Sequence, residues 1–510
     1  MKSSSLRRMF PRSLRWLFAI GGLLLIAILV AIAKPALHVW RAASRDTATA
    51  PITGNGVVND ASRLNATTIT QAIKVAATTA TAEAQLRDLI ARATRDKLAV
   101  SIAGARHSMG GHTIYPGGIA VDMLPFNYMH LDTTTDILHV GAGARWSEIV
   151  PYLNQYGRSV AVMQSNSSFS VGGSISVNCH GWQTRRPPIA STVESFRLMK
   201  ADGQIVRCSR EDNPEMFSLV LGGYGLFGII LDVDLRVVPN ERYKVERIEV
   251  PVELYASTLE QRATVQIGAS MVYGRLDITS KGFLKQALLN VWRTIPHTQG
   301  TSAPLVTLPQ PDLRRNLFRG SVGSEYGKDL RWWCECNLEI PLGATATFRN
   351  NMLDVGVEVY ENRSEQDTDI LHEYFVPPSG FARFVGLVQK IIPRHRADLL
   401  NITVRDVAQD HDTFLRYADG PMLCLVMLFN QRRTAAGESA MQALTSDLID
   451  AALACNGRYY LPYRLHASIE QFDRAYPQAR RFFDLKRILD PEEIFRNQFY
   501  LEYGHRALQQ

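Results

Sequence analysis

Three glycine-rich segments, each close to a predicted β-strand, constrain this chain most strongly. They run from Gly104 to His112, from Gln164 to Gly181 and from Gly222 to Gly228. Small residues let backbone N–H groups approach an anion closely, and successive N–H groups in a turn form an anion-binding nest. Any one of these loops alone is weak support for a binding site, because tight turns also use glycine.

The third segment matches the pattern GxGxxG over residues 223–228. A dinucleotide-binding fingerprint of this kind must open a helix. Residues 229–238 instead alternate in the manner of a strand, so we interpret these glycines as a tight bend.

Periodicity predicts two α+β lobes in series over residues 65–240. We expect a helix over 83–96, strands over 98–104, 137–141 and 229–238, and a helix from an N-cap at Ser147 to about Asn154. Residues 172–177 are predicted to be β-rich. A chain of 510 residues exceeds one ordinary core, and the composition changes at about 241. We therefore expect a second domain over 241–465 and a return to the first over 466–510.

The amino terminus is predicted to be a targeting segment, residues 1–45. Trp16 to Ala33 is an unbroken apolar or small run preceded by basic residues and no acid, which predicts a transmembrane helix with the body outside the cytoplasm. Ser5 to Phe10 resembles a twin-arginine export signal, and Ala31-Ile32-Ala33 offers a cleavage site, so a retained anchor and an exported form both stay open. Residues 46–64 are interpreted as a linker.

Charge argues against a nucleic-acid partner. Residues 1–45 hold eight of the basic residues, which leaves 48 basic against 49 acidic residues in the body. A near-neutral body has no electrostatic footprint for a phosphate backbone. The six cysteines and the histidines lack metal-ligand spacing, so no metal site is predicted.

The motifs GARHSMGGHT, SVGGSISVNCHG and GGYGLFG, in this order, resemble those of the vanillyl-alcohol oxidase, or PCMH-type, FAD-binding oxidoreductase superfamily. Among its members the chain is most similar to aldonolactone and alditol oxidases and related bacterial FAD-linked oxidoreductases. The resemblance implies an α+β fold: a two-lobed PCMH-type FAD-binding domain and an α+β cap over the flavin, here preceded by the transmembrane helix.

The resemblance implies that FAD is the cofactor and that it is linked covalently to His107. A non-covalent pyrophosphate contact is the alternative for this histidine. A second link through cysteine is not expected, because Asn166 stands at that position. The cofactor-binding residues implied are Ala103, Gly104, Ala105, Arg106, His107, Ser108, Gly111, Gln164, Ser165, Gly172, Gly173, Ser176, Asn178, His180, Gly181, Ile229 and Ile230.

The residues implied for catalysis are Arg405, Arg464 and Gln164. Gln164 stands where relatives have a small residue that admits oxygen, so the acceptor is either oxygen or a quinone or cytochrome. Thr403 replaces an acid found in alditol oxidases, whereas Arg405 is kept. His372-Glu373-Tyr374 either lines the cap or ends a strand in solvent.

The leading hypothesis is hydride transfer from a hydroxylated small molecule of the sugar, polyol or lactone class to the flavin. One alternative is a lipid-linked or sterol-like substrate at the membrane, for which apolar residues such as Phe381, Phe384, Val385 and Leu387 would line the cap. Another is a non-catalytic flavin-binding or scaffold protein.

Overall fold

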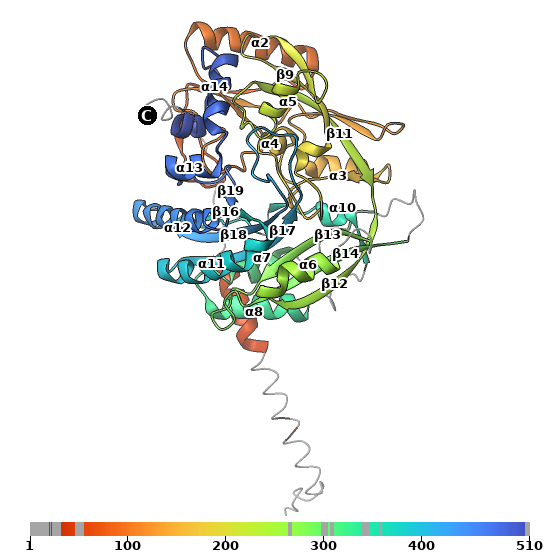
Figure 1. The fold of residues 1–510 in the computed structure, drawn as a ribbon, viewed down its shortest axis with the longest axis vertical. Helices are drawn as coiled ribbons and strands as arrows, with labels where there is room; N and C mark the ends of the chain where they lie inside the picture. The colour runs from red at the N-terminus through yellow and green to blue at the C-terminus, as the bar shows by residue number, and fades with distance from the viewer. Residues whose placement is uncertain are drawn as a thin grey trace, which may run out of the picture.

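The computed structural model describes residues 20, 22, 32–45, 56–263, 268–296, 304–306, 311–338, 346–357 and 360–504. Two layers are stacked along the long axis of the molecule (Figure 1). Residues 56–240 form the body, and residues 242–459 form the cap, whose sheet lies beneath it. The α+β class expected from the sequence is confirmed.

The first lobe of the body is a three-stranded parallel sheet in the order β3-β5-β4, covered by helix α2. Leu86, Leu89, Ile90 and Ala93 form the buried stripe of α2, as the periodicity predicts. The elements are β1 (Val57–Val58), β2 (Thr67–Thr68), β3 (Gln71–Lys74), α2 (Thr79–Arg95), β4 (Val100–Ala103) and β5 (Ile119–Asp122).

The second lobe is a six-stranded antiparallel sheet centred on β11, which continues the bend at 223–228 as a strand and so excludes a Rossmann turn. Its elements are β6 (Met129–Asp132), β7 (Ile137–Gly141), α3 (Trp146–Asn154), β8 (Arg158–Val160), α4 (Val171–Ser176), η1 (Ile189–Thr192), β9 (Val193–Met199), β10 (Ile205–Ser209), α5 (Pro214–Val220) and β11 (Ile229–Pro239).

Two local predictions in this lobe are wrong. Helix α3 begins two residues earlier than expected, and Arg145 rather than Ser147 is its N-cap. Residues 172–177 are not β-rich but form most of helix α4. The paired glycines allow this helix because a Cβ at Gly172 would come within 2.9 Å of Ala142, so the helix packs directly against the chain after β7.

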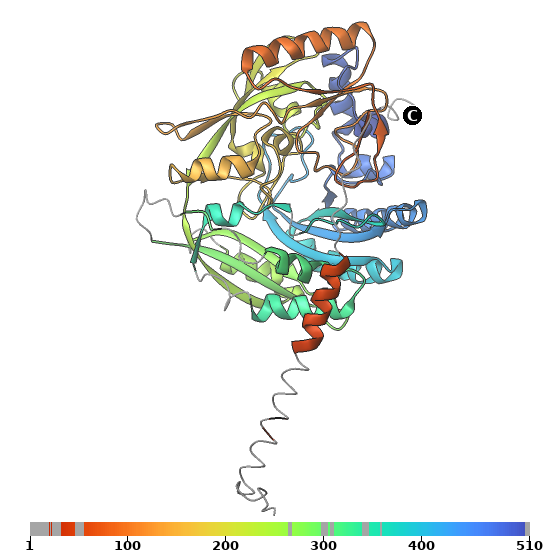
Figure 2. The same cartoon turned by 180° about the vertical axis from the view of Figure 1, so that it is seen from behind.

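The cap is an eight-stranded sheet in the order β15-β12-β14-β13-β17-β18-β16-β19, with helices on its outer face (Figures 1 and 2). Its elements are β12 (Arg242–Pro251), η2 (Val252–Leu254), α6 (Tyr255–Arg262), β13 (Ala269–Leu276), β14 (Gln286–Ile295), α7 (Pro311–Arg319), α8 (Glu325–Asn337), β15 (Ala346–Phe348), α10 (Arg349–Leu353), β16 (Asp367–Val376), η5 (Pro378–Gly380), α11 (Phe381–His395), β17 (Asp398–Val407), β18 (Met422–Arg432), α12 (Ala435–Leu453) and β19 (Arg458–Tyr459).

The carboxyl-terminal helices return to the body. They are α13 (Ile469–Ala475), α14 (Ala479–Leu489) and the π-helical turn Tyr500–Gly504. After α14 the chain runs beside β4, where Val100 donates its N–H to the carbonyl of Ile494 at 2.7 Å and pairs with Phe495. The tail therefore supports the strand that leads into the Gly104 loop.

Of the helices in the described ranges, none is long and apolar enough to cross a membrane. Most of the segment Trp16–Ala33, predicted to be transmembrane, lies outside those ranges. The described part of the amino terminus that follows it, residues 32–45, is helical and lies against the cap (Figure 2).

A buried ion pair fixes the tail. The ammonium of Lys486 binds the Asp490 carboxylate, and both side chains are almost wholly inaccessible. The same carboxylate accepts the N–H groups of Ile494 and Phe495 at 3.0 and 2.9 Å. Removing one partner of a buried pair leaves a charge without compensation.

We expect Lys486→Met to lower the free energy of unfolding by about 3–5 kcal/mol. Arg481→Met, on the exposed side of the same helix, is the matched control and should change it by less than about 0.5 kcal/mol. Chemical denaturation monitored by circular dichroism measures both. Equal effects for the two variants would mean that the pair does not hold the tail.

Candidate active site

A cavity of about 710 Å³ lies between the body and the cap sheet. Its lining comes from the loop after β4, the segment 164–180, the bend before β11, the inner face of the cap sheet and the residues after β19. The three glycine-rich segments singled out from the sequence therefore all border one cavity.

The loop that follows β4 contributes Gly104 to Ser108 to the cavity wall. A Cβ at Gly104 would lie 1.9 Å from the hydroxyl oxygen and 3.0 Å from the Cβ of Ser170, so a larger residue there would displace Ser170. Arg106 has a φ of 57°, which turns the loop sharply. In the described part of the chain, Arg106 Nη1 and Ser108 Oγ are buried and have no hydrogen-bond partner.

Buried polar atoms are normally paired, so these two atoms fit a ligand that brings its own acceptors. A pyrophosphate supplies such acceptors, and the arginine adds the opposite charge. The loop thus fits the phosphate-bearing part of FAD.

His107 follows in the same loop and lines the cavity. Its imidazole stacks on Phe169, with ring centroids 4.1 Å apart. Burial lowers the pKa of His107 to about 4, so the ring is neutral at pH 7. A neutral imidazole keeps a lone pair, which a nucleophile requires.

Gln164 also lines the cavity, and its side chain is fixed at both ends. Its amide donates to the carbonyl of Asn166, and its oxygen accepts the Ser174 hydroxyl, each at 2.9 Å. Ser174 in turn accepts the indole N–H of Trp146 at 2.9 Å. This chain of hydrogen bonds holds Gln164 against α4.

Strand pairing brings four cap positions into one row. Glu373 of β16 pairs with Val426 of β18, Val426 with Thr403 of β17, and Thr403 with Arg275 of β13. Directly opposed residues lie on the same face of a sheet. All four line the cavity, as does Arg405, two residues beyond Thr403 on the same strand.

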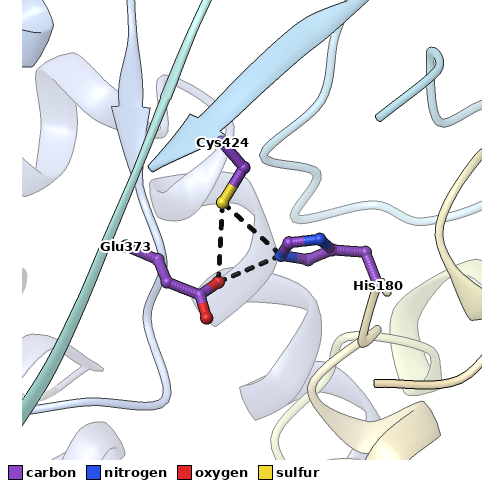
Figure 3. Close-up of side chains that lie close together, drawn as sticks. All are labelled: His180, Glu373 and Cys424. Atoms are coloured by element: carbon purple, nitrogen blue, oxygen red, sulfur yellow. Dashed lines mark hydrogen bonds and ion pairs between the residues drawn. The ribbon is translucent and has the colours of Figure 1, made fainter. Parts of the chain in front are cut away.

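Glu373 lies at the centre of a buried polar cluster (Figure 3). Its Oε2 is 3.0 Å from His180 Nε2, and its Oε1 accepts the Tyr463 hydroxyl at 2.7 Å. The thiol of Cys424 lies 3.8 Å from Oε2 and 3.7 Å from His180 Nε2. Arg405 completes the cluster by donating to the His180 carbonyl at 3.2 Å and to Ser165 Oγ at 2.8 Å.

The charges in this cluster balance. Burial alone would raise the pKa of Glu373, but the hydrogen bond from His180, the charge of Arg405 and the Tyr463 hydroxyl outweigh it and hold the pKa below its usual value. Burial lowers the pKa of His180 in spite of Glu373. Burial also raises the pKa of the Cys424 thiol and of the Tyr463 phenol. Glu373 is thus the anion, and His180 is a neutral donor through Nε2.

His180, Glu373 and Cys424 are also the group of side chains in the described ranges whose donor atoms lie close enough to ligate one metal ion. Their spacing in sequence gave no sign of this, because they come from three distant segments. Both carboxylate oxygens of Glu373 already accept hydrogen bonds, and Arg405 supplies the balancing charge. The geometry is therefore accounted for by hydrogen bonds.

The structure places most of the predicted site residues on the cavity, including His107, Gln164, His180 and Arg405. Arg464 lies outside it, because its guanidinium binds Glu438, Asn65 and the Met109 carbonyl. The adjacent Tyr463 faces the cavity instead. Ala103, Gly111, Asn178, Gly181 and Ile229 also do not line it; Asn178, for example, binds Asp410.

Sequence reasoning missed Arg275 and Tyr463, and it left Glu373 undecided between the cap lining and a solvated strand end. Glu373 is buried on the cavity. The apolar residues Phe381, Phe384 and Val385 of α11 are buried core rather than cavity lining.

Comparison with known proteins agrees with this geometry. Residues 75–209 match the FAD binding domain family. This match and the similarity to the relatives below support the resemblance to the PCMH-type FAD-binding oxidoreductase superfamily. FAD is the cofactor of the chain, and the unpaired atoms of the 104–108 loop suit it.

Three relatives illustrate the range. The chain is 23% identical to L-gulonolactone oxidase of Mus musculus over 83% of this chain and 93% of that protein. It is 28% identical to the uncharacterized oxidoreductase ORF5 in the fasciation locus of Rhodococcoides fascians, over 38% of this chain and 44% of that protein. It is 29% identical to cytokinin dehydrogenase 2 of Oryza sativa subsp. japonica, over 39% of this chain and 38% of that protein. The match thus spans less than half the length of the last two relatives.

Proposed function

We propose that this protein oxidises a hydroxyl-bearing small molecule of the sugar or lactone class and passes its electrons to FAD linked covalently to His107. The observation that carries the proposal is the single cavity in which His107 and the Gly104 loop face Glu373, Arg405 and Tyr463. The similarity to L-gulonolactone oxidase over most of both chains supports the same substrate class.

Bound FAD would supply the acceptor for a hydride. Oxidation of a CH–OH group breaks its C–H bond, whose hydrogen and electron pair go to FAD, and its O–H bond, whose proton needs a base while C=O forms. Glu373 is the ionised carboxylate on the cavity, and each oxygen keeps a lone pair beyond its present hydrogen bond. We assign it as the proton acceptor, held in place by His180 and Tyr463.

Arg405 and Arg275 define the charge of the pocket. Both line the cavity from neighbouring strands of the cap. Guanidinium groups bind carboxylates and carbonyl oxygens through fixed forks of N–H donors. A lactone or an aldonic acid suits such a pair better than an uncharged polyol does, and Thr403 in place of an acid points the same way.

The covalent link is tested by acid precipitation. Wild-type protein should keep its yellow colour in the pellet, and His107→Ala should release it to the supernatant. His130→Ala, at an exposed histidine of β6 in the second lobe of the body, is the matched control. Flavin that washes out of wild-type protein would refute the link while leaving FAD binding intact.

The proton acceptor is tested by anaerobic reduction of the bound flavin with L-gulono-1,4-lactone, L-galactono-1,4-lactone and other aldonolactones and sugars. With the best of these, Glu373→Gln should slow the loss of flavin absorbance roughly 100-fold, because the amide cannot take a proton. Cys424→Ser, beside the same carboxylate, should retain most of the rate.

The pH dependence adds a second readout. The pKa of Glu373 lies below the ordinary value of 4.5, so the carboxylate stays ionised down to pH 4.5. The rate of flavin reduction in the wild type should therefore be constant down to pH 4.5 and fall only at lower pH. The fall should disappear in Glu373→Gln. A flavin that no hydroxylated compound reduces would sink the proposed function altogether.

The position of Gln164 bears on which electron acceptor reoxidises the flavin. A side chain pinned at both ends beside the flavin site obstructs oxygen, which favours a quinone or cytochrome over oxygen as the electron acceptor. We expect the reduced flavin of Gln164→Ala to be reoxidised in air at least tenfold faster than that of the wild type. Stopped-flow absorbance measures both rates. An unchanged rate would show that Gln164 does not control oxygen access.

We propose further that the protein is held at a membrane with its catalytic body outside the cytoplasm. The supporting observation is the apolar run from Trp16 to Ala33 with its basic flank. Export of a cleaved form is the alternative, and the size of the mature chain by mass spectrometry separates the two.

A further inference from the structure

The helix of residues 32–45, here called the docking helix, is built into the cap. It lies at the end of the cap remote from the body in both views (Figures 1 and 2). Its side chains at 35, 38, 39, 42 and 43 are partly buried. That spacing is one stripe of a helix, so one face of the docking helix is covered.

The contacts on that face are specific. His38 Nε2 lies 2.9 Å from the carbonyl oxygen of Gly320, and its ring meets Tyr326 edge-on with centroids 5.1 Å apart. The ammonium of Lys34 lies 4.2 Å from the centre of the same tyrosine ring. A Cβ at Gly327 would lie 2.8 Å from His38 Nε2, so this glycine leaves the space that the imidazole needs.

The opposite face of the docking helix is apolar and uncovered. Leu37 and Trp40 on this face are 46% and 65% exposed. Trp333 of α8, 53% exposed, stands seven residues after Tyr326 and therefore on the same side of α8 as the docking helix. Tryptophan with one face in water is typical of the membrane interface.

The charge of the docking helix suits an anionic bilayer. Lys34, Arg41 and Arg45 are exposed on the docking helix, and residues 1–45 contain no acid. Juxtamembrane basic residues are attracted to anionic lipid headgroups. The predicted membrane segment leads directly into this helix, so the occupant of the apolar face is the bilayer that the segment enters.

We propose that the cap lies on the membrane through this surface, with Leu37, Trp40 and Trp333 in the lipid interface and the FAD-binding body held away from it. The proposal rests on the proposed membrane tether but not on the proposed reaction. It differs from a tether alone, which would leave the cap free of the bilayer.

The test uses the full chain in vesicles of phosphatidylcholine and phosphatidylglycerol that contain brominated lipid, which quenches nearby tryptophan. The quenched fluorescence should fall in Trp40→Phe and in Trp333→Phe relative to wild type. Trp146→Phe, which removes a tryptophan buried in the body, should leave the quenched part unchanged. Subtracting each variant from wild type removes the contribution of Trp16.

His38→Ala separates docking from tethering. If the docking helix holds the cap down, quenching of Trp333 should fall at least twofold in this variant while quenching of Trp40 persists. Vesicle association without any quenching of Trp40 or Trp333 would overturn the proposal and leave the tether. Failure to associate with vesicles would overturn both, and neither result bears on flavin binding or turnover.

Discussion

The hydrogen bond between His180 and Glu373 holds the site together, because it joins the body to the cap across 193 residues of sequence. A carboxylate buried in a protein interior is costly unless its charge is matched. His180 supplies the donor from the body, and Arg405 supplies the charge from the cap and also binds the His180 carbonyl. The carboxylate is therefore stable only when the cap is seated on the body, and the cavity has its shape only then.

The body was largely predictable because its signals are local. Helix α2 and strands β4, β7 and β11 follow from periodicity, and the glycines at 104 and 223–228 mark turns whose geometry requires them. The segment 172–177 was not predictable in this way. Its valine and isoleucine favour a strand, but the helix is stabilised by contacts of Gly172 with Ala142, which lie thirty residues apart.

The residues that the cap contributes to the site could not be predicted, because the signals that bring them together are not local. Glu373, Thr403 and Arg275 form one row only because strands from distant parts of the sequence pair in that register. The resemblance to known enzymes placed Arg405 correctly on the cavity. It also implied a catalytic role for Arg464, but the side chain that lines the cavity there is that of Tyr463. Residues 461–463 form a turn and a bend after β19, and there Tyr463 lines the cavity whereas Arg464 binds Glu438 outside it.

The end of α7 connects the two surfaces that matter for electron flow. Phe318 lines the cavity, and the next residue, Arg319, pairs with Asp369, which also lines it. The residue after that, Gly320, accepts the hydrogen bond from His38 of the docking helix. If the docking helix rests on lipid, Phe318, Arg319 and Gly320 connect the wall of the cavity to the helix that lies at the membrane. A quinone dissolved in the bilayer would then approach the protein from the side of the cap, and the pinned side chain of Gln164 also favours such an acceptor over oxygen.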